Sequence, residues 1–161
     1  MTKFVNYKAS DKMTVKLEQD LSASEIEITI KYASMDRDVE RVIAMLQSMN
    51  TQLRCSYEGS EKIVNILDVY YFESVDKMTF VYCEHDVYKT ELRLYQILEE
   101  YAHLGFVQIS KSCILNISVL NSITPLRNSR MEATLKNAER LYVTRKYLES
   151  VKKALLGWKM A

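Results

Sequence analysis

The stretch Phe106–Asn116, which reads FVQISKSCILN, constrains the fold of this chain more than any other. Val107 and Ile109 alternate with polar residues, which is the period-2 pattern of a half-buried strand. The next residues, S-K-S at 110–112, are polar and basic, and the sequence is apolar again over residues 113–115. A basic turn held between two buried strands is typical of a surface loop that binds a negatively charged partner.

The composition is that of one ordinary globular domain, or of a small domain with an extension. The chain has 161 residues, of which 48% are hydrophobic and 27% charged. With only 3 Gly and 1 Pro it contains no long flexible linker. No apolar run approaches the roughly 18 residues that span a bilayer, and residues 1–6 lack the apolar core of a signal peptide. We therefore expect a cytoplasmic protein.

The net charge of +1 hides a marked asymmetry along the chain. Residues 107–161 contain 10 Lys and Arg against 3 Asp and Glu, a net charge of +7, whereas residues 51–106 contain 5 against 10, a net charge of −5. A basic last third indicates binding to nucleic acid or another polyanion. The alternative is a soluble protein whose charges are simply solvated.

The first 52 residues predict a small ββα extension. Residues 14–18 and 26–32 each alternate apolar and polar side chains, which predicts two strands joined in a hairpin around Asp20–Ser24. Residues 1–12 show no clear period and are expected to fray. Asp36 is a candidate N-cap for an amphipathic helix that ends near Asn50. The face formed by Ile26, Ile28 and Ile30 suits either an internal core or a dimer contact.

Residues 53–90 predict consecutive antiparallel strands and not βαβ units. The expected strands cover residues 53–57, 62–66, 68–74, 78–83 and 86–89. Thr90 is then a candidate cap for a helix that begins at Glu91 and stops at Gly105. The buried stripe of this helix is expected at Leu94, Ile97, Leu98 and Tyr101.

The chain after residue 116 predicts a short turn at 117–120, a hairpin of residues 122–126 and 131–135, and a strand at 140–143. Thr144 is a candidate cap for the last helix, whose buried stripe is expected at Leu148, Val151, Leu155 and Leu156. Arg145 and Lys146 would lie in its first turn, where positive charge opposes the helix dipole. Two cations beside free N–H groups suit a phosphate site, and the alternative is that both are solvated.

Motifs for catalysis and for cofactor binding are absent from the sequence. The 3 cysteines are widely spaced and form no C-x-x-C pair, so we expect reduced thiols and neither a disulfide framework nor a zinc site. Tyr70, Tyr71, Tyr82 and Tyr88 lie at strand spacing and are expected in the core or on the sheet surface. The sequence therefore predicts a protein that is not an enzyme and has no cofactor.

Three segments together carry a family resemblance: F-E-S at 72–74, the stretch 106–116, and V-T-R-K-Y-L at 143–148. In this order and spacing, residues 53–156 resemble the LytTR DNA-binding domain, the output module of many bacterial two-component regulators. The resemblance implies a mainly β (α+β) fold, with an elongated domain of antiparallel sheets and flanking helices at 53–161. Residues 1–52 would then be a dimerisation or regulatory extension, since they are too short for a receiver domain.

The resemblance also implies which residues bind DNA, because this family reads DNA through loops. Two loops would enter successive major grooves, and one would contact the backbone and minor groove between them. Matched by position, the loops are residues 76–79, 110–112 and 144–146. Asn116 also matches the family pattern, but it follows a buried run, so we expect a structural role for it. The candidate DNA-binding residues, including two arginines at the hairpin tip 127–130, are Lys77, Thr79, Ser110, Lys111, Ser112, Arg127, Arg130, Arg145 and Lys146.

The resulting hypothesis is a stand-alone bacterial transcriptional regulator that binds double-stranded DNA specifically. Its expected partners are DNA with repeated half-sites, a second copy of the chain in a homodimer and, as the resemblance implies, a small membrane protein as regulator. The alternative is a protein-interaction module that uses the strand at 26–32 or the helix at 36–50, with DNA binding lost or secondary.

Overall fold

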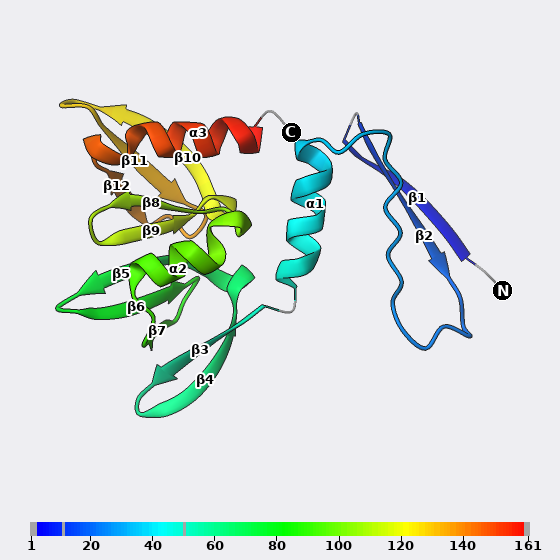
Figure 1. Cartoon of the computed structure of the whole chain (residues 1–161), viewed down its shortest axis with the longest axis horizontal. Coiled ribbons are helices and arrows are strands. Elements are labelled where there is room, and N and C mark those ends of the chain that lie inside the picture. The colour runs from blue at the N-terminus through cyan, green and yellow to red at the C-terminus, as the bar shows by residue number, and fades with distance from the viewer. Residues whose placement is uncertain (1–2, 11, 50, 160–161) are drawn as a thin grey trace. The chain divides into compact units, whose positions relative to one another are not determined.

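The computed structural model describes residues 3–10, 12–49 and 51–159. By its internal contacts the chain divides into two units, residues 1–33 and 34–161, and each is described by itself (Figure 1). The sequence grouped the helix at 36–50 with the extension, whereas the contacts group it with the second unit. Within the described residues, no helix is both long and apolar enough to cross a membrane.

The first unit is an antiparallel hairpin of β1 (Lys3–Ser10) and β2 (Met13–Gln19). The strand expected at 14–18 is confirmed, but its partner is β1, in the segment expected to fray. Val5 pairs with Leu17 and Tyr7 with Val15, so these four apolar residues share one face. The pairing of the two strands ends with Ser10 opposite Met13.

The strand predicted at residues 26–32 is wrong, because this segment has no regular structure. Its predicted hairpin with β2 is also wrong. After β2 the chain makes a local turn in which the Asp20 carboxylate accepts hydrogen bonds from the Ser22 N–H at 2.8 Å and the Ser22 hydroxyl at 2.6 Å. A strand needs a neighbouring backbone for its N–H and C=O groups, and β1 already pairs with β2.

The second unit opens with α1 (Arg37–Ser48), whose predicted N-cap is confirmed. One Asp36 carboxylate oxygen accepts hydrogen bonds from the N–H groups of Asp38 and Val39, both at 3.1 Å. Asp38 and Glu40 lie in the first turn, where negative charge complements the helix dipole.

The main body of this unit is a seven-stranded antiparallel sheet in the order β4-β3-β7-β6-β5-β9-β8. Its strands match the positions that the sequence predicted, to within about two residues at each end. They are β3 (Gln52–Tyr57), β4 (Ser60–Asn65), β5 (Val69–Val75), β6 (Met78–Cys83), β7 (Val87–Thr90), β8 (Phe106–Ser110) and β9 (Cys113–Asn116).

A second, three-stranded antiparallel sheet follows in the order β10-β11-β12. It contains β10 (Leu120–Leu126), β11 (Arg130–Leu135) and β12 (Arg140–Val143), as the predicted hairpin and strand required. Short 3-10 turns precede or follow the strands at η1 (Ile66–Asp68), η2 (Ala102–Leu104), η3 (Ile117–Val119) and η4 (Arg145–Tyr147).

The helix predicted from Glu91 begins later, as α2 (Leu94–Tyr101), with Arg93 as its N-cap residue. Thr90 is not the cap, because it remains in β7 opposite Thr79. The Thr90 hydroxyl instead donates to the Arg54 carbonyl at 3.3 Å. The predicted apolar stripe and the stop at Gly105, whose φ is +97°, are both confirmed.

Two hydrophobic cores lie on opposite faces of the seven-stranded sheet. On one face α2 packs through Ile97 and Tyr101 against Phe72 and Ile114. On the other face the second sheet and α3 (Leu148–Lys159) pack against the large sheet. Together they form a second core of Tyr70, Tyr71, Ile109, Cys113, Leu115, Val119, Ala133, Leu135, Val143 and Val151. Strand β9 faces both cores, so all four of its residues are buried.

The predicted stripe of the last helix is only partly right. Val151 is buried, Leu148 and Leu155 are half-buried, and Leu156 is exposed. Leu156 lies five positions after Val151, so the helix turns it about 140° away from the buried side.

Asn116, at the end of β9, links this strand to its neighbour β5 through a side-chain hydrogen bond. Its side-chain N–H donates to the Val69 carbonyl on β5 at 2.8 Å, and its side-chain oxygen accepts from the Ser118 N–H at 3.0 Å. The residue is 2% exposed, so its partners cannot turn to water if the amide is removed.

We expect Asn116→Ala to lower the free energy of unfolding by about 1–3 kcal/mol, because it leaves a buried carbonyl and a capping N–H without their partner. Denaturant titration measures this change. Asn121→Ala, at an exposed position of β10, is the matched control and should change stability little. Equal stability of the two variants would contradict a structural role for Asn116.

Candidate nucleic-acid interface

Four chain reversals lie at one end of the second unit. They are the β5–β6 turn, the β8–β9 turn, the β10–β11 turn and the passage from β12 into η4. Figure 1 shows all four on the left of the domain. The three predicted loops and the predicted hairpin tip therefore come together, although they are up to about 70 residues apart in the sequence.

Backbone hydrogen bonds fix three of these reversals to one another. The Ser74 N–H, just before the β5–β6 turn, donates to the Ser112 carbonyl in the β8–β9 turn at 2.8 Å. The Thr144 N–H, at the start of η4, donates to the Ile109 carbonyl at 2.9 Å. The β8–β9 turn thus lies between the other two and positions both.

The β5–β6 turn is tight and presents Lys77. Asp76 and Lys77 adopt left-handed conformations with φ of 50° and 65°, and the lysine is exposed. The Arg93 guanidinium donates a hydrogen bond to the Lys77 carbonyl and so ties this turn to the start of α2.

Thr79 is the one candidate residue that the structure removes from this surface. It lies in β6 between Ser74 of β5 and Thr90 of β7, and it is 2% exposed. The structure therefore places Thr79 inside the sheet and not on the surface where the sequence expected it.

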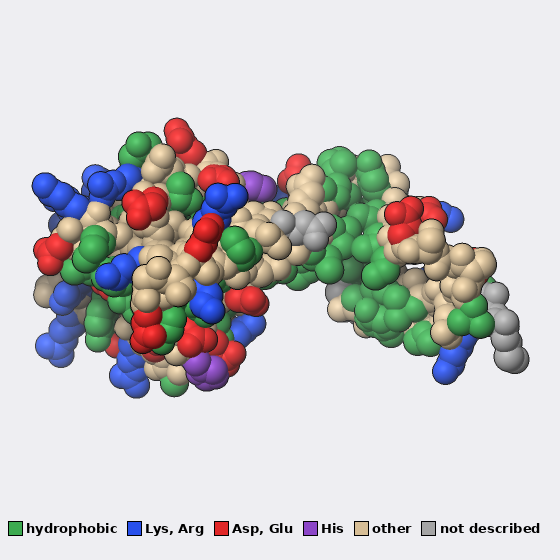
Figure 2. Space-filling view, turned by 90° about the horizontal axis from the view of Figure 1, so that it is seen from below, with side chains coloured by type: hydrophobic (Ala, Val, Ile, Leu, Met, Phe, Trp, Pro, Cys, Tyr) green, Lys and Arg blue, Asp and Glu red, His purple; other side chains and the backbone are tan. Residues whose placement is uncertain are grey.

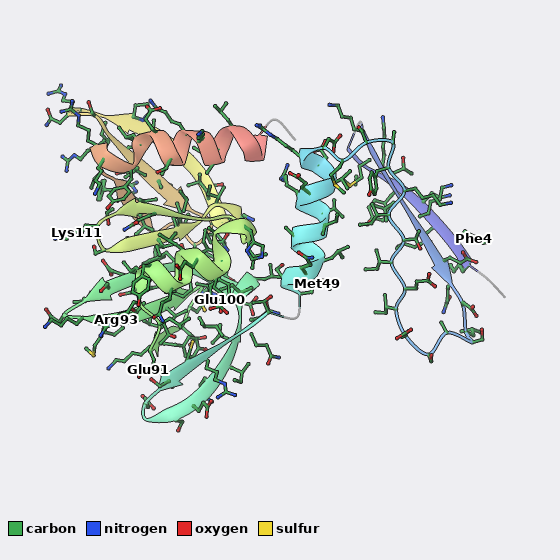
Figure 3. All side chains as sticks on the ribbon, in the orientation of Figure 1. Phe4, Met49, Glu91, Arg93, Glu100 and Lys111 are labelled. Atoms are coloured by element: carbon green, nitrogen blue, oxygen red, sulfur yellow. The ribbon has the colours of Figure 1, made fainter. Side chains whose placement is uncertain are left out.

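The β8–β9 turn presents Lys111, with a serine on each side. Lys111 is exposed, whereas Ser110 and Ser112 are half-buried. The Ser110 hydroxyl accepts a hydrogen bond from the Ser112 N–H at 3.3 Å, which shapes the turn. Figure 3 shows Lys111 pointing outward from the domain.

The third loop differs in detail from the sequence prediction. Arg145 and Lys146 lie in the 3-10 turn η4, before the first turn of α3, where Glu149 supplies the favourable negative charge. Thr144 is not a side-chain cap, since its hydroxyl donates to the Ile109 carbonyl at 3.5 Å. Both cations are exposed, and the Lys146 ammonium lies 5.5 Å from the Tyr147 ring centre.

The β10–β11 turn adds Arg127 and Arg130, which are both exposed. Asn128 and Ser129 form the turn with φ of 62° and 54°. Met131 pairs with Val143, so the start of β11 lies beside the end of β12. The hairpin tip and η4 are therefore at the same end of the small sheet.

The six cations of these reversals form what we call the basic end of the domain: Lys77, Lys111, Arg127, Arg130, Arg145 and Lys146. Figure 2 shows Lys and Arg side chains gathered at this end. Among the described residues, none of the six is in an ion pair with a carboxylate, whereas Arg140 is held by Glu132 at 3.8 Å. Unneutralised cations leave a surface that favours a polyanion.

Two of the three cysteine thiols are buried in the cores. Burial raises the pKa of the Cys113 thiol to about 12 and that of Cys55 to about 11, so neither is a reactive thiolate near neutral pH. Tyr71 stacks on Tyr82 with ring centres 4.2 Å apart, and the Tyr82 hydroxyl donates to Glu73 at 3.3 Å. Tyr71 is buried and Tyr82 is half-buried against the same core, in agreement with the prediction of core or sheet-surface positions.

Arg93 is a candidate that the sequence did not reveal. It adds an exposed cation next to the β5–β6 turn, and Figure 3 shows it on the same side of the domain as Lys111. It stands just before a helix and in no recognisable motif, so its place beside Lys77 follows from the packing of α2 on the sheet.

Comparison with known proteins identifies the family. Residues 60–156 match the model of the LytTr DNA-binding domain, which covers more than half of the chain. The chain belongs to the LytTR family. A Staphylococcus aureus protein (strain NCTC 8325 / PS 47), named as an uncharacterized HTH-type transcriptional regulator, is 30% identical over 145 residues, with 88% of this chain and 98% of the relative aligned. A relative from strain N315 has the same name, identity and coverage.

A solved structure supports the same fold. The LytTr DNA-binding domain of a putative methyl-accepting/DNA response regulator from Bacillus cereus superposes with a TM-score of 0.63 at 23% identity, over 66% of this chain and 97% of that one. LytTR domains are DNA-binding modules and not enzymes, in agreement with the sequence prediction.

The helices of this LytTR protein do not form a helix-turn-helix, although its relatives are named HTH-type. In the described part, strands β3–β7 separate α1 from α2, and strands β8–β12 separate α2 from α3. A helix-turn-helix needs two helices joined by a turn of about 3–4 residues. The six cations of the basic end lie at turns instead.

We expect Arg93→Ala to loosen the β5–β6 turn, because the turn loses its side-chain tie to α2. Hydrogen–deuterium exchange should then be faster for the amides of residues 76–78 than in the wild type. Arg54→Ala, at an exposed position of β3, is the control and should leave these amides unchanged. Unchanged exchange in Arg93→Ala would show that the tie does not hold the turn.

Proposed function

We propose that this LytTR protein is a sequence-specific transcriptional regulator that binds double-stranded DNA with the basic end of its second unit. The proposal rests on the six exposed cations that come together at four turns of one domain, in a chain of a DNA-binding family. Among the described residues, none of the six is in an ion pair with a carboxylate. Relatives named as transcriptional regulators support the regulatory part.

Phosphate contacts would supply most of the affinity. Each phosphate that a Lys or Arg neutralises releases counterions, so binding should weaken steeply as the salt concentration rises. The logarithm of the binding constant should fall by about 0.9 per phosphate contact for each tenfold rise in salt. Lys77 on the β5–β6 turn and Arg127 and Arg130 at the β10–β11 turn suit this role, and so does Lys146, which lies next to Arg145 on η4. Ser110 and Ser112 would add hydroxyl contacts beside Lys111.

We assign base recognition to Arg145 on η4 and to Lys111 on the β8–β9 turn. Arg145 can donate two parallel hydrogen bonds to the O6 and N7 atoms of guanine, which a lysine does less specifically. Lys111, beside it on the β8–β9 turn, can reach either guanine or phosphate. The hydrogen bond from the Thr144 N–H to the Ile109 carbonyl fixes the spacing between these two turns, so they would approach DNA as one unit.

A single module of this size makes a small DNA interface, so we propose a homodimer on repeated half-sites. In this arrangement residues 53–161 bind DNA and residues 1–52 bring the two copies together. The protein would act in the cytoplasm, where bacterial DNA lies. A membrane-protein partner stays a prediction of the family resemblance.

The first experiment is selection of genomic fragments with purified full-length protein, followed by salt titration of the best fragment. Enrichment of a repeated motif with steeply salt-dependent affinity is the expected result. Binding without an enriched motif would contradict sequence-specific recognition and would favour the protein-interaction alternative. The exposed apolar side chains of residues 4–35 support that alternative.

We expect Arg145→Ala to weaken binding to the selected site by about 1–3 kcal/mol and to relax preference at one base position. Fluorescence anisotropy with the site and with single-base variants measures both effects. Arg54→Ala removes an exposed arginine far along the sheet and should bind like the wild type. Wild-type affinity of Arg145→Ala would remove Arg145 from the interface.

We expect Lys111→Ala to separate the two roles open to Lys111. If the lysine contacts phosphate, affinity falls for all sequences alike and the salt slope decreases by about 1. If it contacts guanine, discrimination at one base falls as well. A variant with unchanged affinity and salt slope would contradict a DNA contact from Lys111.

A further inference from the structure

The segment 26–32 has the sequence of a strand but lacks a partner for one. Its residues alternate strictly between apolar and polar, with Ile26, Ile28, Ile30 and Tyr32 on one side and Glu27, Thr29 and Lys31 on the other. In the structure the segment is irregular, and Ile26 is 91% exposed, Ile28 57% and Tyr32 52%. Strand-forming residues that are this exposed are characteristic of a contact surface.

The backbone of the segment is as unpartnered as its side chains. The structure gives no hydrogen-bond partner to the N–H and C=O groups of residues 26–32, within the part of the chain that it describes. A pairing strand would satisfy a whole row of these groups at once. The sequence pattern thus specifies a strand, and a single chain does not complete it.

We propose that residues 26–32 pair antiparallel with the same residues of a second copy of this chain. The two-fold axis would pass between the two copies of Thr29. Ile28 then lies opposite Ile30 of the other copy, and Ile26 lies opposite Tyr32. All eight apolar side chains fall on one face of the two-stranded ribbon, as an isologous dimer contact requires.

The charges select this register. With the axis at Thr29, Glu27 lies opposite Lys31 of the other copy, and the symmetry repeats this pair. A parallel pairing in register would place each charge opposite its own copy, which is unfavourable. Moving the axis to residue 28 leaves Tyr32 without an apolar partner. The Thr29 register alone pairs all seven residues and both opposite charges.

A second copy is therefore the occupant that fits this segment best. The proposal rests on the proposed function insofar as it supplies the dimer that repeated half-sites require. The strand pairing itself is tested without DNA, so failure of one does not decide the other.

The test uses full-length protein without DNA, in sedimentation equilibrium over a range of concentrations. The wild type should dimerise. E27K places two positive charges opposite each other, and K31E two negative ones, so each should weaken the dimer by roughly tenfold or more. An equimolar mixture of E27K and K31E should recover a mixed dimer, and the double variant E27K/K31E should recover its own.

E25K is the matched control, because it makes the same charge change two residues earlier, at a position opposite Ala33 in this register. It should dimerise like the wild type. Residues 25, 27 and 31 are exposed and outside the domain cores, so circular dichroism should show an intact fold in every variant. Hydrogen exchange should show protection of residues 26–32 only under dimer-forming conditions.

A monomeric wild type, or single variants that dimerise like the wild type, would overturn the proposal. So would a mixture of E27K and K31E that stays monomeric, or an E25K variant that dissociates as readily as E27K. On DNA, E27K should bind one half-site normally and lose only the gain from a second half-site. Loss of single half-site binding in R145A, by contrast, reports on the basic end alone.

Discussion

The pairing of β5 with β9 is the interaction on which the rest of the domain depends. These two strands are neighbours in the large sheet, between β6 and the edge strand β8, and their residues face two cores. Ile114 and Phe72 face α2, while Leu115 and Tyr71 face the small sheet. A strand pair that is buried on both faces cannot slip by one residue, because every side chain would then enter the wrong core.

The basic end follows from this fixed register. The turns that carry Lys77 and Lys111 are the direct continuations of β5 and β9, and the bond from Ser74 to Ser112 holds them together. The small sheet packs on the same core through Ala133 and Val143, which places η4 beside β8. Flexible cations thus stand on short turns whose backbones are rigid, which reduces the entropy lost on binding.

The two units of the chain differ in how their apolar surface is satisfied. The second unit buries large side chains on both faces of a sheet, whereas the first contains a two-stranded hairpin followed by an exposed apolar segment. A two-stranded hairpin alone is marginally stable in water. This difference supports the proposal that the second unit binds DNA and that the first unit joins two copies of the chain.

The amino-acid sequence by itself determined the local features. Period-2 alternation predicted the strands of the second unit, Asp36 predicted the start of a helix, and turn residues predicted the reversals that form the basic end. These signals can be read from the sequence because each acts within a few residues. The tertiary structure decided what depends on distant partners. It paired β2 with β1, so residues 26–32 have no pairing strand. It also buried Thr79 between two strands and started α2 at Leu94 instead of Glu91. It also set Arg93 beside Lys77. Which backbone is free to pair, and which face meets a core, are properties of the whole packed chain and not of a short segment.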